Sequence, residues 1–239
     1  MRAIKKLIRN IILLNKINSS LWIYLNYFKS FLKSYYVSKK NFDNVVKFKK
    51  FISNKSFSTD WTSTNIPFWC EYLKFSNFNT LNIIEIGSWE GLTTNFINFY
   101  FPNAKIVCID TWEGSDEHKL NKYNQSSTEK LFDKNNSNID IKKYKMKSSD
   151  FFKRRMHILY DLIYIDGSHF YKDVLNDCIN SFKILKLNGY LILDDYFWVF
   201  YKNINDNPAS AINFFLKNYK SKFKIIHLSD QVILKKISH

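Results

Sequence analysis

Short apolar runs alternate with amphipathic segments through the last two thirds of the chain. The runs predicted as strands are Leu81–Ile86, Lys105–Asp110, Ile139–Lys145, Leu159–Asp166, Tyr190–Asp194, Lys224–Leu228 and Gln231–Ile237. The segments predicted as helices are Leu92–Tyr100, Ser126–Asn135, Asp150–His157, Phe170–Lys186 and Ala209–Lys222. This alternation predicts an α/β fold with a mostly parallel sheet and helices on both faces. The last two runs are joined by Ser229-Asp230, so we expect a hairpin and an antiparallel edge strand.

The first third of the chain is predicted to be helical and basic. Its apolar residues fall roughly on one stripe, formed by Ile4, Leu7, Ile8, Ile11, Leu14, Leu21, Trp22, Leu25 and Phe28. Lys5, Lys6, Arg9 and Lys16 lie elsewhere on the helix. Two interpretations are open. The stripe can lie on an anionic membrane, or it can pack against its own domain or a second subunit.

The charge of the chain changes this picture little. Lys and Arg number 36 against 21 Asp and Glu, a net charge of +15, which suits a nucleic-acid or membrane partner. The excess is nearly all lysine, and the only arginines are Arg2, Arg9, Arg154 and Arg155. Nucleic acid is therefore disfavoured as a partner, because the bidentate guanidinium is scarce.

Cysteine usage and the amino terminus indicate the compartment. Cys70, Cys108 and Cys178 are scattered without metal-ligand spacing, which fits a reducing environment. No secretory cleavage pattern follows the first residues. No apolar run approaches the roughly 20 residues of a membrane span. We expect a cytoplasmic protein that is at most peripheral to a membrane.

Distinctive residues follow the first two predicted strands. Glu85–Gly91 comes after the first, where Gly87 lets the backbone approach a ligand and Gly91 lets the next helix begin close by. The segment lacks the Gly-x-Gly-x-x-Gly of a dinucleotide fold. Asp110 ends the second strand, where ligands of open parallel sheets bind. Its carboxylate suits the ribose hydroxyls of NAD, FAD or another nucleoside equally well.

Three carboxylates follow the later strands of the predicted sheet. Asp166 ends one strand and Asp194 and Asp195 end the next, so neighbouring strands would bring them together. Converging carboxylates repel, so either one is protonated or a cation is present. Hard oxygen ligands without cysteine suit Mg²⁺. His169 sits near a helix start, which keeps it neutral as a general base requires. The alternative is that Ser168 or Asp195 caps a helix or turn and the others are solvated.

In their order and spacing, the segments Glu85–Gly91, Asp110–Ser115, Asp166–His169 and Asp194–Tyr196 together resemble the class I S-adenosylmethionine-dependent methyltransferases. The branch that they resemble most includes the macrocin-type sugar O-methyltransferases, and catechol O-methyltransferase is a more distant relative. The resemblance runs from about Ser58 to Lys236. It implies a Rossmann-like seven-stranded sheet whose last strand is reversed. It divides the chain into a helical N-terminal extension, residues 1–57, and a methyltransferase domain, residues 58–239.

The resemblance also implies roles for individual residues. The S-adenosylmethionine-binding set would be Glu85, Gly87, Ser88, Gly91, Asp110, Thr111, Trp112 and Ser148. Asp166, Asp194 and Asp195 would hold Mg²⁺, although catechol O-methyltransferase has an amide at the last of these positions. Asp166 and His169 would be catalytic, with Glu90 or Glu113 as alternative bases. We expect Trp61, Tyr196 and Trp198 to contact the substrate.

The expected reaction is methyl transfer to a hydroxyl of a small molecule or sugar. Three other classes compete with it. An NAD-dependent oxidoreductase is disfavoured by the missing glycine fingerprint and the terminal hairpin. A nucleic-acid methyltransferase would use the basic charge, and a membrane-associated nucleotide-binding module would lack catalysis. Peripheral membrane contact and homo-oligomerisation through the N-terminal helix both stay open.

Overall fold

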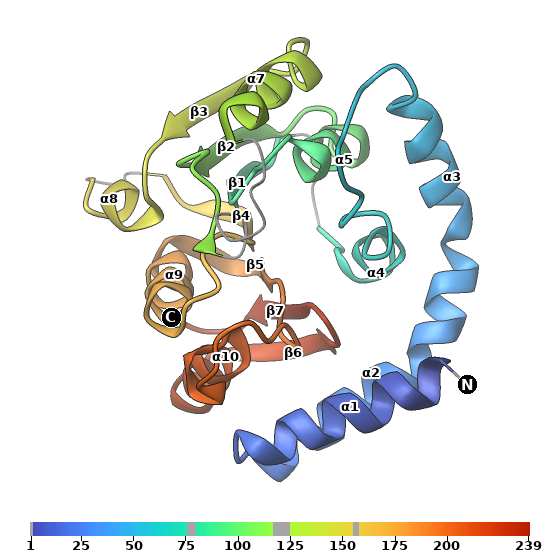
Figure 1. Ribbon diagram of the computed structural model, residues 1–239, viewed down its shortest axis with the longest axis vertical. Coiled ribbons are helices and arrows are strands. Elements are labelled where there is room, and N and C mark those ends of the chain that lie inside the picture. Colours follow the sequence, from blue (N-terminus) through green and yellow to red (C-terminus); the bar gives the residue numbers. More distant parts are fainter. Residues whose placement is uncertain (1, 76–79, 117–124, 155–157) are drawn as a thin grey trace.

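A seven-stranded sheet in the order β3-β2-β1-β4-β5-β7-β6 forms the centre of the computed structural model, which describes residues 2–75, 80–116, 125–154 and 158–239 (Figure 1). The strands are β1 (Asn82–Ile86), β2 (Lys105–Asp110), β3 (Ile141–Lys145), β4 (Tyr160–Ile165), β5 (Leu185–Leu193), β6 (Phe223–Leu228) and β7 (Val232–Lys236). All seven predicted strands are present, and the predicted fold class is confirmed.

The last two strands form the expected antiparallel hairpin, which joins the rest of the sheet through β7. Strand β7 pairs antiparallel with β5 on one side and with β6 on the other, so it lies inside the sheet. Strand β6 is therefore the edge strand. A hairpin pattern predicts that the two strands pair with each other, but not which of them pairs with β5. Burial decides here, because Val232, Ile233 and Leu234 are fully buried.

Helices cover both faces of the sheet. Their bounds are α1 (Arg2–Lys16), α2 (Leu21–Lys40), α3 (Phe42–Phe51), α4 (Ile66–Tyr72), α5 (Leu92–Tyr100), α7 (Gln125–Asn135), α8 (Ser148–Phe152), α9 (Tyr171–Ile184) and α10 (Pro208–Asn218). One apolar cluster joins the sheet to α1, α8, α9 and α10, and a second joins its other face to α3, α4, α5 and α7. Residues 155–157 of the predicted helix Asp150–His157 lie outside the described residues.

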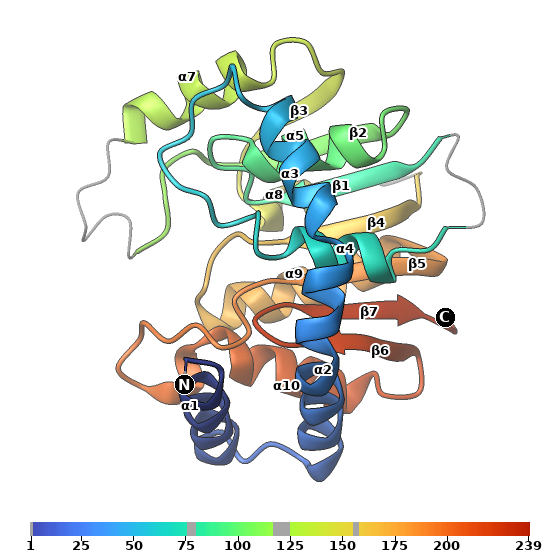
Figure 2. The same cartoon turned by 90° about the vertical axis from the view of Figure 1, so that its right-hand side faces the viewer.

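The N-terminal extension forms three helices, of which α1 and α2 lie at the β6 end of the sheet and α3 runs along one side beside α4 and α5 (Figures 1 and 2). The expected single stripe is wrong, because the helix breaks at residues 17–20 and the stripe divides. Leu14 is fully buried, whereas Ile8 and Leu25 are exposed. The side chain of Asn10 donates to the hydroxyl of Tyr27 at 3.2 Å, which ties α1 to α2. The division of the chain at residue 57 stays a prediction.

Two further expectations concern the interior and the membrane. Cys108 and Cys178 are buried free thiols in the two apolar clusters. Along the described part of the chain, no helix combines the length and the apolar character that crossing a bilayer needs.

Candidate functional site

The loop after β1 packs directly against the end of β4. Gly87 has a φ of +84°, and a β-carbon there would lie 1.8 Å from the carbonyl oxygen of Asp166. Its amide donates to the carbonyl of Ile109 at 2.9 Å. Only glycine tolerates both the left-handed backbone and this approach. The close contact brings the loop after β1 within reach of the carboxylate that ends β4.

The Asp110 carboxylate, at the end of β2, accepts hydrogen bonds from three backbone amides. Its Oδ2 accepts from Ser88 at 2.8 Å and Trp89 at 2.9 Å, and its Oδ1 accepts from Trp112 at 2.7 Å. Trp89 and Trp112 adopt positive φ values of 46° and 54°, which bulky residues rarely do. Burial raises the pKa of Asp110, and the amides oppose that rise. Charge-assisted bonds of this kind offset the backbone strain.

A cavity of about 760 Å³ opens along the carboxyl ends of the strands. At one end it is lined by Gly87, Asp110, Thr111, Met146, Lys147, Ser148 and Ser149. At the other end it is lined by Trp61, Asp166, His169, Asp194, Asp195 and Trp198. The expected groups from β1, β2, β4 and β5 therefore meet on one cavity. Its volume is in the range of small-molecule and cofactor sites.

Two carboxylates and an imidazole form a cluster inside this cavity. One ligand atom from each of Asp166, His169 and Asp195 lies within 4.8 Å of the others. The Nε2 atom of His169 is 2.9 Å from Asp195 Oδ2 and 3.8 Å from Asp166 Oδ1. Burial raises the pKa of Asp166 to about 6, although His169 opposes the rise. A cation or a proton is favoured here because the carboxylates are close and desolvated.

Asp194 differs from the other two carboxylates. Its Oδ2 accepts from the hydroxyl of Tyr164 and, at 2.7 Å, from the side chain of Gln231. Its Oδ1 accepts from the amide of Asp195 at 2.8 Å. Burial, followed by the charges of Asp166 and Asp195, raises its pKa well above the usual range. Asp194 lines the cavity but lies outside the three-residue cluster, and its predicted role as a cation ligand stays a prediction.

Sequence reasoning missed Tyr164 and Gln231. The Tyr164 hydroxyl bridges Asp194 and Asp166, donating to Asp166 over 2.9 Å. Residues two apart in a strand share a face, so this pairing with Asp166 was open to prediction. Gln231 accepts from the indole of Trp69 at 2.8 Å while donating to Asp194. That link spans distant segments, and no local pattern signals it.

Five of the predicted site residues are not among the described residues that line the cavity: Glu85, Ser88, Gly91, Trp112 and Tyr196. The Glu85 side chain is fully buried and accepts from Thr94 of α5, and burial raises its pKa to about 8. Ser88 contributes its backbone amide to Asp110, while its side chain is buried. The side chains of these two residues support the loop from behind, and their predicted contacts with a cofactor stay predictions.

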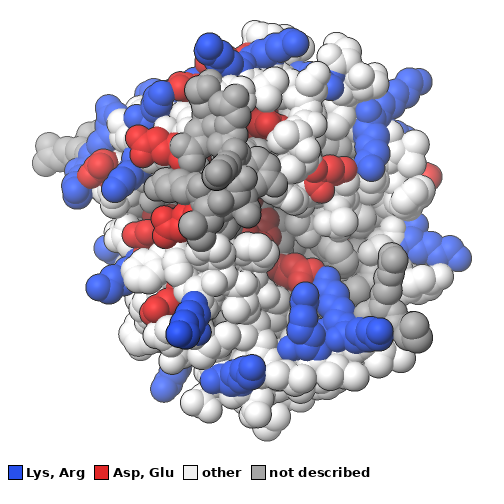
Figure 3. All heavy atoms as spheres, in the orientation of Figure 1, with Lys and Arg blue, Asp and Glu red and all other residues white. Residues whose placement is uncertain are grey.

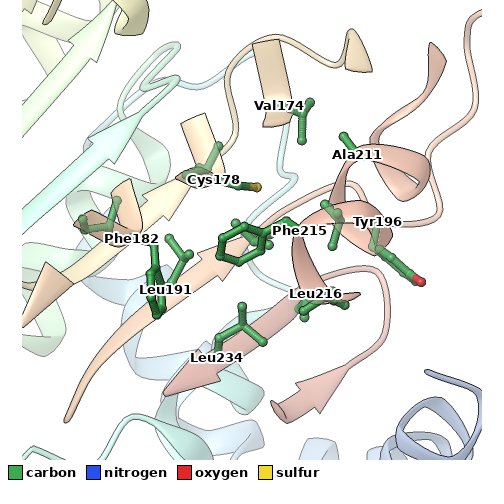
Figure 4. Packing of buried hydrophobic residues seen from close by; sticks show 14 of the residues in the cluster. Val174, Cys178, Phe182, Leu191, Tyr196, Ala211, Phe215, Leu216 and Leu234 are labelled. Carbon is green, nitrogen blue, oxygen red and sulfur yellow. The ribbon is translucent and has the colours of Figure 1, made fainter. Parts of the chain in front are cut away.

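The other three residues also serve the packing of the loops and the core. Gly91 has a φ of +80°, and a β-carbon would lie 1.9 Å from the side chain of Asn136. The ring of Trp112 packs on Phe132 and its indole donates to the carbonyl of Trp89. Tyr196, expected at the substrate, is fully buried beside α10, and its hydroxyl donates to Asn213 at 2.6 Å (Figure 4).

A fourth carboxyl lies just behind the cavity. Asp177 of α9 is 1% exposed, and its Oδ2 lies 3.9 Å from the position of a β-carbon on Gly167. Its Oδ1 has no hydrogen-bond partner among the described atoms. Burial raises its pKa from 3.8 to about 7, and Ser148 offsets only part of this. The chain therefore tolerates a buried acid next to a wall of the cavity.

Comparison with known proteins gives this arrangement a family context. A family model described as a methyltransferase domain matches residues 84–196. A search of curated protein sequences finds no match.

Three solved structures illustrate the similarity in fold. MycE methyltransferase from the mycinamycin biosynthetic pathway, in complex with Mg and SAH, is 12% identical with a TM-score of 0.57, and the match covers 81% of this chain and 54% of that one. This chain thus spans about half the length of MycE. A putative O-methyltransferase from Klebsiella pneumoniae is 10% identical, with coverage of 82% and 89% and a TM-score of 0.53. A putative caffeoyl-CoA O-methyltransferase from Staphylococcus aureus is 15% identical, with coverage of 86% and 99% and a TM-score of 0.50.

The buried carboxyl of Asp177 predicts a specific pH dependence of stability. Its pKa is raised in the folded chain, so folding favours the protonated form. The free energy of unfolding is therefore not reduced by this carboxyl below about pH 4, where it is protonated in both the folded and the unfolded chain. The free energy of unfolding falls as the pH rises towards 7. At pH 8 we expect Asp177→Asn to raise the free energy of unfolding by up to about 4 kcal/mol. Urea unfolding of both proteins between pH 4 and 8 measures this difference, and a constant difference across that range would contradict it.

Proposed function

We propose that the chain is a class I methyltransferase that methylates a hydroxyl of a small molecule or sugar, and the match of a methyltransferase-domain family model to residues 84–196 supports this. The methyl donor is S-adenosylmethionine and a divalent cation assists. The observation that carries the proposal is one cavity that joins Gly87 and Asp110 to the cluster of Asp166, His169 and Asp195. The solved methyltransferases support it through their fold.

The cofactor end of the cavity fits a nucleoside. Asp110 Oδ2 accepts hydrogen bonds from two backbone amides, whereas Oδ1 accepts one. Oδ1 can therefore accept a further hydrogen bond from a ribose hydroxyl. Gly87 keeps the wall free of a side chain. Ser148 and Ser149 line the same part of the cavity and offer hydroxyls to a purine or ribose. S-adenosylmethionine supplies the methyl group, whose bond to sulfur breaks as a bond to the acceptor oxygen forms.

The donor set at the other end fits a hard divalent cation. Asp166 and Asp195 offer carboxylate oxygens beside a histidine, and burial raises the pKa of Asp166 to about 6. Such a cation would lower the pKa of an acceptor hydroxyl and draw these carboxylates together. Tyr164 and Gln231 hold Asp194, which in turn holds the amide of Asp195. They are positioning residues for the cation site.

His169 is the proposed general base. It stands just before α9, which begins at Tyr171. Its Nε2 contacts Asp195 at 2.9 Å, so a carboxylate of the proposed cation site also orients the ring. Trp198 stands edge-on to the ring with centroids 6.1 Å apart. The imidazole would take the proton of the acceptor hydroxyl as the new oxygen–carbon bond forms.

The charge of the cavity points to the class of acceptor. Nine described lining residues are acidic: Asp60, Asp110, Glu113, Asp116, Asp166, Asp173, Asp194, Asp195 and Asp230. Lys147 and His169 are the basic residues among the described residues that line the cavity. Figure 3 shows several acidic side chains around the middle of this face, with most lysines and arginines nearer its rim. Such a field attracts a sulfonium and repels phosphates.

Exposed aromatic rings complete the acceptor side. Trp61 is 49% exposed and Trp198 is 40% exposed, and both line the cavity. Flat indole faces beside carboxylates suit a polyhydroxylated ring that is neutral or carries an amino group. The same charges disfavour the nucleic-acid alternative, because its phosphates would have to enter an acidic cavity.

Binding of S-adenosylmethionine to the full chain is the first test. Titration calorimetry is expected to show saturable binding, and Asp110→Ala is expected to weaken it by roughly tenfold, or about 1.4 kcal/mol. The loss follows because three amides lose their common acceptor. Asp133→Ala, which removes an exposed carboxylate on α7, is the control. Absence of heat with the unchanged chain would refute the proposed activity.

The roles of His169 and Asp195 can be separated. His169→Ala is expected to lower kcat by about a hundredfold or more while Mn²⁺ affinity, followed by electron paramagnetic resonance, stays close to that of the unchanged chain. Asp195→Asn is expected to lower both. His239→Ala, at the exposed chain end, is the control. Equal loss of Mn²⁺ in the His169 variant would make the imidazole a ligand rather than the base.

The acceptor class can be tested with matched compounds. Simple glycosides and their phosphate monoesters are incubated with the chain, S-adenosylmethionine and Mg²⁺, and release of S-adenosylhomocysteine is followed. We expect the phosphates to react at least about tenfold more slowly, because the acidic lining costs a doubly charged group several kcal/mol of attraction. Faster turnover of the phosphates, or of RNA, would reject the proposed acceptor class.

A further inference from the structure

Helix α1 carries apolar side chains on two opposite sides. Leu13 and Leu14 face the sheet and are buried. Ile4, Ile8 and Ile12 recur every fourth residue on the outward side and are 61%, 53% and 50% exposed. A helix that only covered its own domain would need the first set alone. The outward isoleucines are therefore unexplained by the packing of this chain.

Helix α2 repeats this pattern over twenty residues. Its buried side is formed by Ile23, Tyr27, Ser30 and Val37. The opposite side exposes Leu21 (73%), Leu25 (60%), Phe28 (40%), Leu32 (77%), Tyr35 (79%) and Tyr36 (64%). Figure 2 shows α1 and α2 at the same end of the molecule, beside β6 and α10. We call the outward sides of these two helices the N-terminal face.

The helices of the N-terminal face carry charged side chains of one sign, although Lys6 pairs with Asp230 and Lys40 with Glu71 from other elements. Residues 1–42 contain no aspartate or glutamate, and their basic residues are Arg2, Lys5, Lys6, Arg9, Lys16, Lys29, Lys33, Lys39 and Lys40. Lys29 and Lys33 are exposed and flank the stripe of α2. Large apolar side chains bordered by lysines are the pattern of helices that lie in the headgroup region of an anionic bilayer.

We propose that the N-terminal face docks this protein on an anionic lipid bilayer. Acyl chains would bury the outward isoleucines and leucines, and acidic headgroups would meet the lysines. A second copy of the chain fits less well, because a symmetric contact would place two basic faces opposite each other. A nucleic acid would use the lysines but leave the apolar stripe in water. The bilayer accepts both features.

Vesicle flotation with the full chain tests the proposal. Vesicles of equal parts phosphatidylglycerol and phosphatidylcholine are compared with vesicles of phosphatidylcholine alone. We expect binding to the first, weakened by salt. Lys29→Glu with Lys33→Glu should weaken it by at least about thirtyfold, since each lysine near such a surface contributes about 1 kcal/mol. The matched control is Lys130→Glu with Lys134→Glu, on α7 at the far end of the molecule (Figure 1).

A second pair of variants tests the apolar part. Leu21→Gln with Leu25→Gln should abolish flotation, whereas Ile158→Asn with Leu159→Gln, also exposed but outside this face, should leave it unchanged. Circular dichroism checks that each variant is folded. Failure of the unchanged chain to float with the anionic vesicles overturns the proposal. A stable dimer in sedimentation equilibrium that Leu21→Gln with Leu25→Gln dissociates also overturns it, because the face would then bind a second copy.

Discussion

The contact between Gly87 and the Asp166 carbonyl joins the two halves of the cavity. It forces the loop after β1 against the end of β4 so closely that no side chain fits between them. The backbone ladder continues this join, since Asp166 donates to Ile86 and Asp194 donates to Ile165. A nucleoside held at Asp110 and a hydroxyl held near Asp166 would thus share one rigid wall. Precise alignment of the reacting atoms needs such a wall.

Desolvated negative charge is the electrostatic cost of this arrangement. Glu85, Asp166 and Asp177 all have pKa values raised mainly by burial. The chain offsets this cost by different means at different positions. Asp110 is satisfied by backbone amides, and Asp194 by a tyrosine and a glutamine. The cluster at Asp166 is left to a histidine and, in our proposal, to a cation, and this is where chemistry can occur.

The sequence predicted the strands and the ends where polar groups gather, because both follow from local patterns. It could not predict the direction of side chains in the loops. Trp112 and Tyr196 follow strands as expected, yet their rings turn into the apolar clusters. Likewise, Gly91 is required by its φ of +80° and by the neighbouring side chain of Asn136, a contact that the sequence did not reveal. Contacts such as Gln231 with Asp194 depend on how distant segments meet, which a single chain pattern does not encode.

The N-terminal helices show a related limit of prediction from sequence, which concerns the burial of apolar residues. Helical periodicity identified Ile8 and Leu14 as members of one apolar stripe, but only the packing separates the exposed residue from the buried one. That separation is itself informative. Water would favour polar residues on an outward helix face, and the chain has many lysines to place there. Leucines and isoleucines between those lysines therefore indicate a partner that offers both hydrocarbon and negative charge.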